Sequence, residues 1–235
     1  MEGRLHNIEG RRGASPAGLL SRDYLTVAPI ERWLREVAAP CARGTLLDAG
    51  CGNKPYAGLF RTVTECYIGA DLTQNAFNTV DVIVDPSHCL PFREGSFDTV
   101  LSTQVLEHVP DPAAYLAEVR RVLTRGGHLL LTCPASYMLH EEPHDYFRFT
   151  EHGIRILLQR VGLTVVRVDT AGGAWRLIGQ ILLNHKAFGR RWHIPILSGI
   201  VYVATLVVSN LTFSLLDSIN TNRRDTANYM IIAQK

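Results

Sequence analysis

Residues 140–150 hold the densest group of polar and aromatic side chains in the chain. Histidine titrates near neutral pH, so it suits the removal of a proton from an acceptor group. We therefore interpret His144 as a general base that Asp145 would orient, with His140 as the second candidate. The candidate catalytic residues are thus His144, Asp145 and His140, and the candidate substrate-binding residues are Tyr146 and Arg148.

The same residues also have a purely structural interpretation. Asp145 and Arg148 would then form an ion pair, and His144 would bind a loop carbonyl. His140 and His144 are four residues apart, a spacing that could hold a metal ion on one face of a helix. Pro143 argues against a regular helix there, so the sequence predicts no metal site.

The elements that must position these residues follow from the apolar runs of the chain. Helices are expected at residues 24–37, 112–123 and 151–161. Strands are expected at residues 45–48, 66–70, 81–84, 97–102, 128–133, 163–168 and 227–233. Strands that alternate with helices predict an α/β fold with a mostly parallel sheet covered on both faces. In such sheets, ligands bind beyond the carboxyl ends of the strands.

Glycines and aspartates stand at three of these strand ends. Gly50 and Gly52 follow the first strand, where a missing Cβ lets the backbone approach a ligand. Asp71 ends the second strand at the usual distance for a carboxylate that accepts both hydroxyls of a ribose. Asp85 ends the third strand, and Asp48 lies in the first. The Gly-x-Gly pair alone could be a plain tight turn, but the ordered aspartates favour a ligand site.

With these motifs in place, the sequence resembles the class I S-adenosylmethionine-dependent methyltransferases over about residues 46–134. The matching segments are residues 46–52, 69–71, Asp85 with 90–92 and 96–98, 105–109, 121–123 and 126–127. The resemblance implies a Rossmann-like seven-stranded sheet, with an N-terminal helix and an apolar helical insertion before the last strand. It also implies S-adenosyl-L-methionine as cofactor and S-adenosyl-L-homocysteine as product.

The resemblance also implies roles for individual residues. Asp48, Gly50 and Gly52 would line the methionine part of the cofactor, and Asp71 would hold the ribose. Asp85 and Pro86 would lie beside the adenine, and Gln104 would face the sulfonium end. The expected cofactor-binding set is Asp48, Gly50, Cys51, Gly52, Asp71, Leu72, Asp85, Pro86 and Gln104. Glu107 and His108 are interpreted as a capping or surface pair.

One departure from the family pattern concerns a third glycine, which often stands where this chain has Lys54. A dinucleotide pyrophosphate needs the close helix approach that this glycine gives, so its absence disfavours NAD. The expected reaction is methyl transfer to an oxygen of a small-molecule, sugar or lipid-linked acceptor. The alternatives are an NAD-dependent oxidoreductase on a similar fold and a non-catalytic cofactor-binding scaffold.

Residues 194–216 carry no charge and are long enough to span a bilayer. The strands on either side must pair in one sheet, which argues against a single membrane pass. Three interpretations remain: a wall over a lipid-like acceptor, a surface that contacts a membrane with help from Lys186, Arg190, Arg191 and His193, or a buried helix or homodimer face.

Composition sets the remaining expectations. The net charge of +2, 46% hydrophobic and 20% charged residues fit a folded protein without a nucleic-acid partner. The five cysteines form no CxxC pair, so neither a cysteine zinc site nor a disulfide framework is expected. Residues 1–21 are expected to be a flexible N-terminal segment, and they lack the apolar core of a signal peptide. A cytoplasmic location is therefore expected, either free or in peripheral contact with the inner face of the membrane. Residues 22–235 are expected to form one methyltransferase domain, with a cofactor-binding core at 44–134, a substrate loop at 135–150 and an apolar helical insertion at 174–222.

Overall fold

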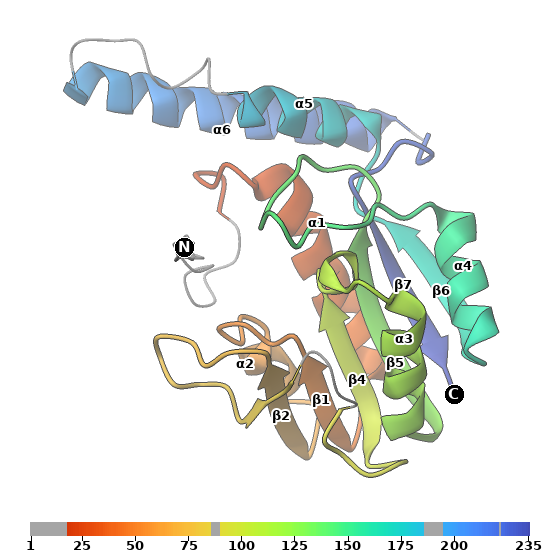
Figure 1. The fold of residues 1–235 in the computed structure, drawn as a ribbon. Coiled ribbons are helices and arrows are strands. Elements are labelled where there is room, and N and C mark those ends of the chain that lie inside the picture. The colour runs from red at the N-terminus through yellow and green to blue at the C-terminus, as the bar shows by residue number, and fades with distance from the viewer. Residues whose placement is uncertain (1–17, 86–89, 186–194, 221) are drawn as a thin grey trace.

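The structure is a computed structural model that describes residues 18–85, 90–185, 195–220 and 222–235 (Figure 1). At its centre is a seven-stranded sheet of order β3-β2-β1-β4-β5-β7-β6. The strands are β1 (Thr45–Ala49), β2 (Cys66–Asp71), β3 (Val82–Ile83), β4 (Phe97–Thr103), β5 (Leu123–Pro134), β6 (Thr164–Thr170) and β7 (Asn228–Gln234). The first five pair in parallel, and β7 runs antiparallel to β5 and β6. The predicted mostly parallel Rossmann-like sheet is therefore confirmed.

Helices cover both faces of this sheet because neighbouring strand residues point to opposite sides. On one face, Leu46 and Leu101 pack with the helices α1 (Tyr24–Trp33) and α2 (Ala57–Phe60). On the other, Leu47 and Val100 pack with α3 (Pro112–Val122) and α4 (Glu151–Arg160). After α1 the chain continues as a π-helical turn, η1 (Leu34–Ala38), and a 3₁₀ turn, η2 (Ala39–Cys41). The buried strands thus form two apolar cores.

The helix starts follow from their capping residues. The Asp111 carboxylate accepts a hydrogen bond from the Ala114 amide, and Pro112 occupies the first turn of α3. The Thr150 hydroxyl accepts from the Gly153 amide at the start of α4. Both caps fix where the helices leave the carboxyl edge of the sheet.

Strand β5 is longer than the sequence predicted. It begins at Leu123, which pairs with Phe97, and the register shifts before Thr99 pairs with His128. Gly126, at a φ of 75°, lies within this irregular stretch. The strand was expected to begin at residue 128, whereas it passes through the Gly126–Gly127 pair with a bulge, where glycine accommodates the left-handed backbone.

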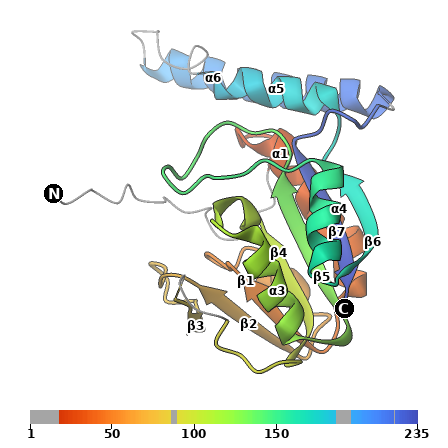
Figure 2. The same ribbon diagram turned by 45° about the vertical axis from the view of Figure 1, so that its right-hand side comes forward.

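The insertion before β7 forms a pair of helices, α5 (Ala174–Asn184) and α6 (Pro195–Ile219), that pack on each other and on α1. Figures 1 and 2 place this pair across the end of the molecule toward which β1 and β4 run. The predicted apolar helical insertion is therefore confirmed. Lys186, Arg190, Arg191 and His193 lie outside the described residues, as does most of the predicted N-terminal lead-in.

Candidate functional site

The glycine loop after β1 is held against the end of β2. The amides of Gly50 and Cys51 both donate to the Ala70 carbonyl, at 2.8 and 3.1 Å. Gly50 has a φ of 79°, and a Cβ on it would lie 2.4 Å from a Val105 methyl group. Gly52 has a φ of 50°, but a Cβ there would meet no atom of the described residues within 4 Å. Gly50 is therefore required by packing, whereas Gly52 borders open space.

Asp71 closes the loop from the end of β2. One carboxylate oxygen accepts from the Gly52 amide at 2.7 Å, and the other accepts from the Leu72 amide at 2.7 Å. These two bonds fix the carboxylate at the mouth of the glycine loop, and the side chain of Leu72 is exposed beside it. The position is the one expected of a residue that accepts ribose hydroxyls.

Asp48 lies beneath the loop in β1 and is 1% exposed. Burial raises the pKa of its carboxyl to about 7, although the hydrogen bond from the Tyr67 hydroxyl lowers it in part. Its other oxygen, Oδ1, has no hydrogen-bond partner among the described residues. A buried, partly unsatisfied carboxyl is costly by itself, and a cationic ligand would compensate it. Cys51 is buried next to it, and desolvation raises the pKa of that thiol to about 12, so it stays protonated.

Lys54 stands where the family often has a third glycine, and it adopts the left-handed conformation that a glycine would favour, with a φ of 53°. Its side chain is buried and passes over Gly69, where a Cβ would lie 2.2 Å from the lysine Cε. The Lys54 Nζ ends 2.5 Å from the Asp81 carboxylate, which also accepts from the Gly69 amide at 2.7 Å. Burial raises the pKa of Asp81, but the Gly69 amide and Lys54 more than offset this and hold it below its ordinary value.

Two further predicted cofactor residues, Asp85 and Gln104, lie along the same edge of the sheet. Asp85 follows β3 and is exposed, and Pro86 lies outside the described residues. Gln104 follows β4 at a φ of 54°, and its side-chain amide donates to the Thr132 hydroxyl at 3.1 Å. This edge therefore brings together Asp48, Gly50, Gly52, Asp71, Asp85 and Gln104, and among the described residues no atom lies within 4 Å of a Cβ built on Gly52.

The residues present fit S-adenosylmethionine. The Asp48 oxygen without a partner, the open space at Gly52 and the strand-end carboxylate of Asp71 provide sites for a cationic amino acid part and a ribose. The loop amides of Gly50 and Cys51 bind Ala70, so they are not aimed at a pyrophosphate. This arrangement suits a cofactor without phosphates.

Residues 140–150, the polar loop, lie above this edge. Their side chains pair differently from the prediction. Asp145 does not orient the His144 ring: its carboxylate accepts two hydrogen bonds from the Arg148 guanidinium, at 2.6 and 2.7 Å. It also accepts from the His140 amide and lies 3.2 Å from the His140 Nδ1. The His144 Nδ1 instead lies 3.0 Å from the Tyr146 hydroxyl. The ion pair of the structural interpretation is therefore present, and the Arg148 bonds hold the pKa of Asp145 far below its ordinary value.

Glu107 and His108 form a turn, η3 (Leu106–His108), directly beneath this loop. The Glu107 side chain is fully buried, and its backbone carbonyl accepts from the amides of Tyr146 and Phe147. The interpretation as a surface pair was wrong, because the loop folds over the turn and removes the glutamate from solvent. The sequence pattern alone carries no signal of that burial, since it depends on contacts between distant segments.

A comparison with known families matches residues 47–131 to the family described as "Methyltransferase domain". Among curated relatives, the chain is 31% identical over 146 residues to a ubiquinone biosynthesis O-methyltransferase of Thiobacillus denitrificans, covering 50% of this chain and 62% of that protein. The chain therefore spans well under the full length of this relative.

Solved structures share the fold at low identity. An S-adenosylmethionine-dependent methyltransferase from Mesorhizobium loti gives a TM-score of 0.54 at 17% identity and covers 93% of this chain and 100% of that one. Phosphoethanolamine N-methyltransferase 2 of Haemonchus contortus, in complex with S-adenosyl-L-methionine, gives 0.54 at 17%, with coverage of 94% and 57%.

Proposed function

We propose that this chain, whose residues 47–131 match the family described as "Methyltransferase domain", is an S-adenosylmethionine-dependent methyltransferase that methylates a hydroxyl oxygen of a lipid-linked acceptor at a membrane surface. The observation that carries the lipid-linked acceptor is the outward apolar surface of α5 and α6, which lies at the same end of the molecule as the cofactor edge (Figures 1 and 2). The cytoplasmic face of a membrane is the proposed location.

When bound, the cofactor supplies an electrophilic methyl group on a sulfonium. The chain's own residues must then bind the cofactor, orient the acceptor and remove a proton from its hydroxyl group. Asp48, Gly50 and Gly52 would hold the methionine part, and Asp71 the ribose. Because the Asp48 carboxyl is buried, its negative charge would attract the cationic groups of the ligand more strongly than an exposed carboxylate would.

His144 is the residue we assign to proton removal. Its ring is exposed above the η3 turn, and its Nδ1 lies 3.0 Å from the Tyr146 hydroxyl. If Nδ1–H donates to that oxygen, Nε2 carries the lone pair and takes the proton of the acceptor. Loss of a general base typically lowers the rate by about 10²–10⁴-fold. His144→Ala should show such a loss at saturating cofactor, with S-adenosylhomocysteine affinity unchanged. A wild-type rate in this variant would rule out the base assignment.

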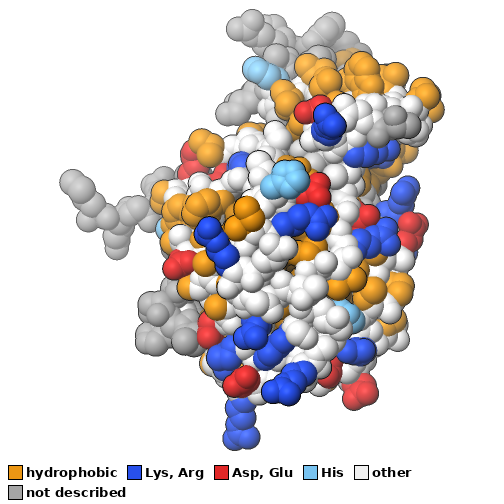
Figure 3. Space-filling view, turned by 90° about the vertical axis from the view of Figure 1, so that its right-hand side faces the viewer, with side chains coloured by type: hydrophobic (Ala, Val, Ile, Leu, Met, Phe, Trp, Pro, Cys, Tyr) orange, Lys and Arg blue, Asp and Glu red, His pale blue; other side chains and the backbone are white. Residues whose placement is uncertain are grey.

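The two helices of the insertion are apolar on the outside and polar on the inside. Trp175, Ile178, Ile181 and Leu182 are exposed on α5, and Val208, Leu211, Leu215 and Ile219 on α6. The polar residues Gln180, Asn210 and Asp217 are instead nearly fully buried. A helix that packs on a water-soluble body normally has the opposite pattern. Figure 3 shows hydrophobic side chains gathered over this end of the molecule.

The buried polar groups fasten the helix pair to the body. The Asn210 amide donates to the carbonyls of Leu19 and Ser21, and the Gln180 amide donates to the Arg22 carbonyl. The Asp217 carboxylate accepts from the Gly173 amide at 2.9 Å. The only charged residues in the two helices, Arg176 and Asp217, lie 3.6 Å from each other on this inner side. The outer faces therefore carry no charge that a lipid surface would have to desolvate.

The length of the helix pair and its place in the fold favour an orientation in which α5 and α6 lie on the bilayer surface instead of crossing it. Val201–Ile219 is long and apolar enough to cross a membrane by composition, and 17% of the window is buried against protein. The insertion leaves from β6 and returns to β7, which are antiparallel neighbours in the sheet. Both ends of the insertion are thus held on the same side of the membrane. We therefore propose that the helix pair lies in the membrane–water interface with its outer face toward the lipid.

Vesicle flotation tests the membrane proposal. The wild-type chain should float with vesicles that contain anionic lipid, and a Val208→Ser, Leu211→Ser, Leu215→Ser variant should stay at the bottom. The matched control changes exposed apolar residues of the body, Ile156→Ser with Val166→Ser, and should float like the wild type. A wild-type chain that does not float but elutes as a homodimer, separated by the triple change, would assign the face to a second copy and overturn the proposal.

A further inference from the structure

Where the polar loop meets the η3 turn, three side chains lie close enough to share one metal ion. Ligand atoms of Glu107, His108 and His140 all lie within 4.8 Å of one another. The Glu141 carboxylate reaches the same group, 3.6 Å from the His108 Nε2. We propose that these residues bind a divalent transition-metal ion such as Zn²⁺, with Glu107, His108 and His140 as ligands and Glu141 as a fourth.

The His108 ring is oriented for metal binding. Its Nδ1 lies 2.8 Å from the His144 carbonyl oxygen, which can only accept, so Nδ1 carries a proton. In the neutral ring, Nε2 then has the lone pair. That nitrogen faces two carboxylates, Glu107 at 3.8 Å and Glu141 at 3.6 Å. A lone pair directed at two carboxylates is repulsive unless a proton or a metal cation lies between them.

The His140 ring has the same arrangement. Its Nδ1 lies 3.2 Å from the Met138 carbonyl and 3.2 Å from the Asp145 carboxylate, and these two acceptors outweigh the Arg148 Nη2 contact at 3.5 Å. A histidine that donates one ring N–H to a carboxylate or carbonyl and presents the other nitrogen is the usual metal-binding arrangement. Arg148 in turn holds the Asp145 carboxylate in place, so the orientation of the His140 ring is fixed by two residues outside the metal site.

Charge in the cluster also fits a divalent ion. The Asp145 and Arg148 charges cancel, which leaves the carboxylates of Glu107 and Glu141 beside the two imidazole rings. Two nitrogen and two oxygen ligands suit Zn²⁺ and its neighbours in the first transition series. Metal–ligand bonds of about 2.1 Å place ligand atoms about 3–4 Å apart, so closing the site needs side-chain movements of about 1 Å.

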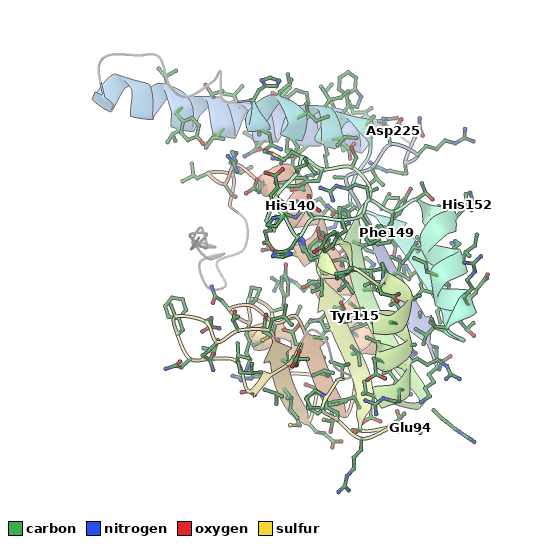
Figure 4. The ribbon with its side chains drawn as sticks, in the orientation of Figure 1. Glu94, Tyr115, His140, Phe149, His152 and Asp225 are labelled. Atoms are coloured by element: carbon green, nitrogen blue, oxygen red, sulfur yellow. The ribbon has the colours of Figure 1, made fainter. Side chains whose placement is uncertain are left out.

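The position of the cluster suggests what the metal would do. Val105, which packs against Gly50 of the cofactor loop, precedes Glu107 by two residues, and Figure 4 shows His140 at the carboxyl edge of the sheet. A metal there would lower the pKa of a bound acceptor hydroxyl and prepare it for loss of its proton. This role rests on the proposed function; the binding of the metal does not.

Titration of the chelator-treated full chain with Co²⁺ tests the site, because Co²⁺ in a nitrogen–oxygen site gives visible absorption bands. We expect equimolar binding, displacement by Zn²⁺, and at least a tenfold loss of affinity in His108→Ala and in His140→Ala. Glu141→Gln should weaken binding less. His152→Ala is the control, because this histidine lies on α4, away from His140 (Figure 4), and should bind like the wild type.

Thermal unfolding and S-adenosylhomocysteine binding report whether each variant is folded. A wild-type chain that binds S-adenosylhomocysteine but gives no Co²⁺ bands would overturn the metal site and leave the methyltransferase proposal standing. Equal Co²⁺ binding by wild type, His108→Ala and His140→Ala would also overturn it. Bands that depend on both histidines, in a chain that methylates no acceptor, would support the site and count against the proposed function alone.

Discussion

The Lys54 ammonium lies 2.5 Å from the Asp81 carboxylate, and this ion pair ties the glycine loop to the segment that leads into β3. The lysine stem fills the space above Gly69, so the departure from the family's third glycine has a structural role. Lys54→Met keeps the stem and removes the charge. Because Asp81 is partly exposed, we expect a loss of ~1–2 kcal/mol of unfolding free energy and a weaker cofactor site.

The pH dependence of that loss checks its origin. The folded-state pKa of Asp81 lies below its ordinary value of 3.8, so the pair contributes stability above that pH and loses it as the pH falls through the folded value. Urea unfolding of wild type and Lys54→Met should differ at neutral pH and converge in acid. A difference that stays constant with pH would mean that packing, rather than charge, is responsible.

Asp48 should make cofactor binding depend on pH. Its folded-state pKa is raised to about 7 by burial, so much of it is protonated below that pH, whereas a cationic ligand prefers the ionised form. S-adenosylmethionine affinity should therefore rise between about pH 6 and 7.5, with proton release on binding that titrations in buffers of different ionisation enthalpy can measure. Asp48→Asn should bind more weakly and show no such rise.

The same carboxyl should lower the stability of the protein. Since the folded-state pKa is above the unfolded one, the cost appears as the pH rises from about 4 to about 7 and is then constant. Asp48→Asn removes it and should be more stable than the wild type by roughly 2–4 kcal/mol at pH 8, measured by urea unfolding. Equal stability of the two proteins at pH 8 would contradict the raised pKa.

The two glycines of the loop should separate folding from binding. Gly50→Ala introduces a methyl group 2.4 Å from Val105 in a left-handed backbone, so it should lower stability by roughly 1–3 kcal/mol and also reduce binding. Gly52→Ala meets no atom of the described residues within 4 Å. It should cost only the backbone strain of about 1 kcal/mol but project into the ligand space, lowering S-adenosylhomocysteine affinity at least tenfold. Wild-type affinity in Gly52→Ala would place the ligand elsewhere.

The sequence predicted those parts of the site that depend on strand order. Asp48, Gly50 and Asp71 stand at the ends of apolar runs, and parallel pairing brings such ends to one edge whatever the details of packing. The start of β5 was predicted too late because Gly126 resembles a helix end, whereas the structure uses it in a bulge.

Side-chain pairing within the polar loop was beyond the sequence pattern. Adjacent residues such as His144 and Asp145 point in different directions in an irregular segment, and Asp145 instead meets Arg148 and His140. The burial of Glu107 likewise arises from a contact between the η3 turn and residues 146–147. Neither follows from local spacing, because both depend on how the loop folds over the sheet.

Calorimetric titration with S-adenosylhomocysteine, with NAD in parallel, tests the cofactor assignment most directly. The Asp71 carboxylate at the mouth of the glycine loop should make binding micromolar for the wild type and at least tenfold weaker for Asp71→Ala and Asp71→Asn, of which the latter keeps the size of the side chain. Neither variant nor the wild type should bind NAD. Binding of NAD alone, or S-adenosylhomocysteine affinity that is unchanged in both folded variants, would contradict the account.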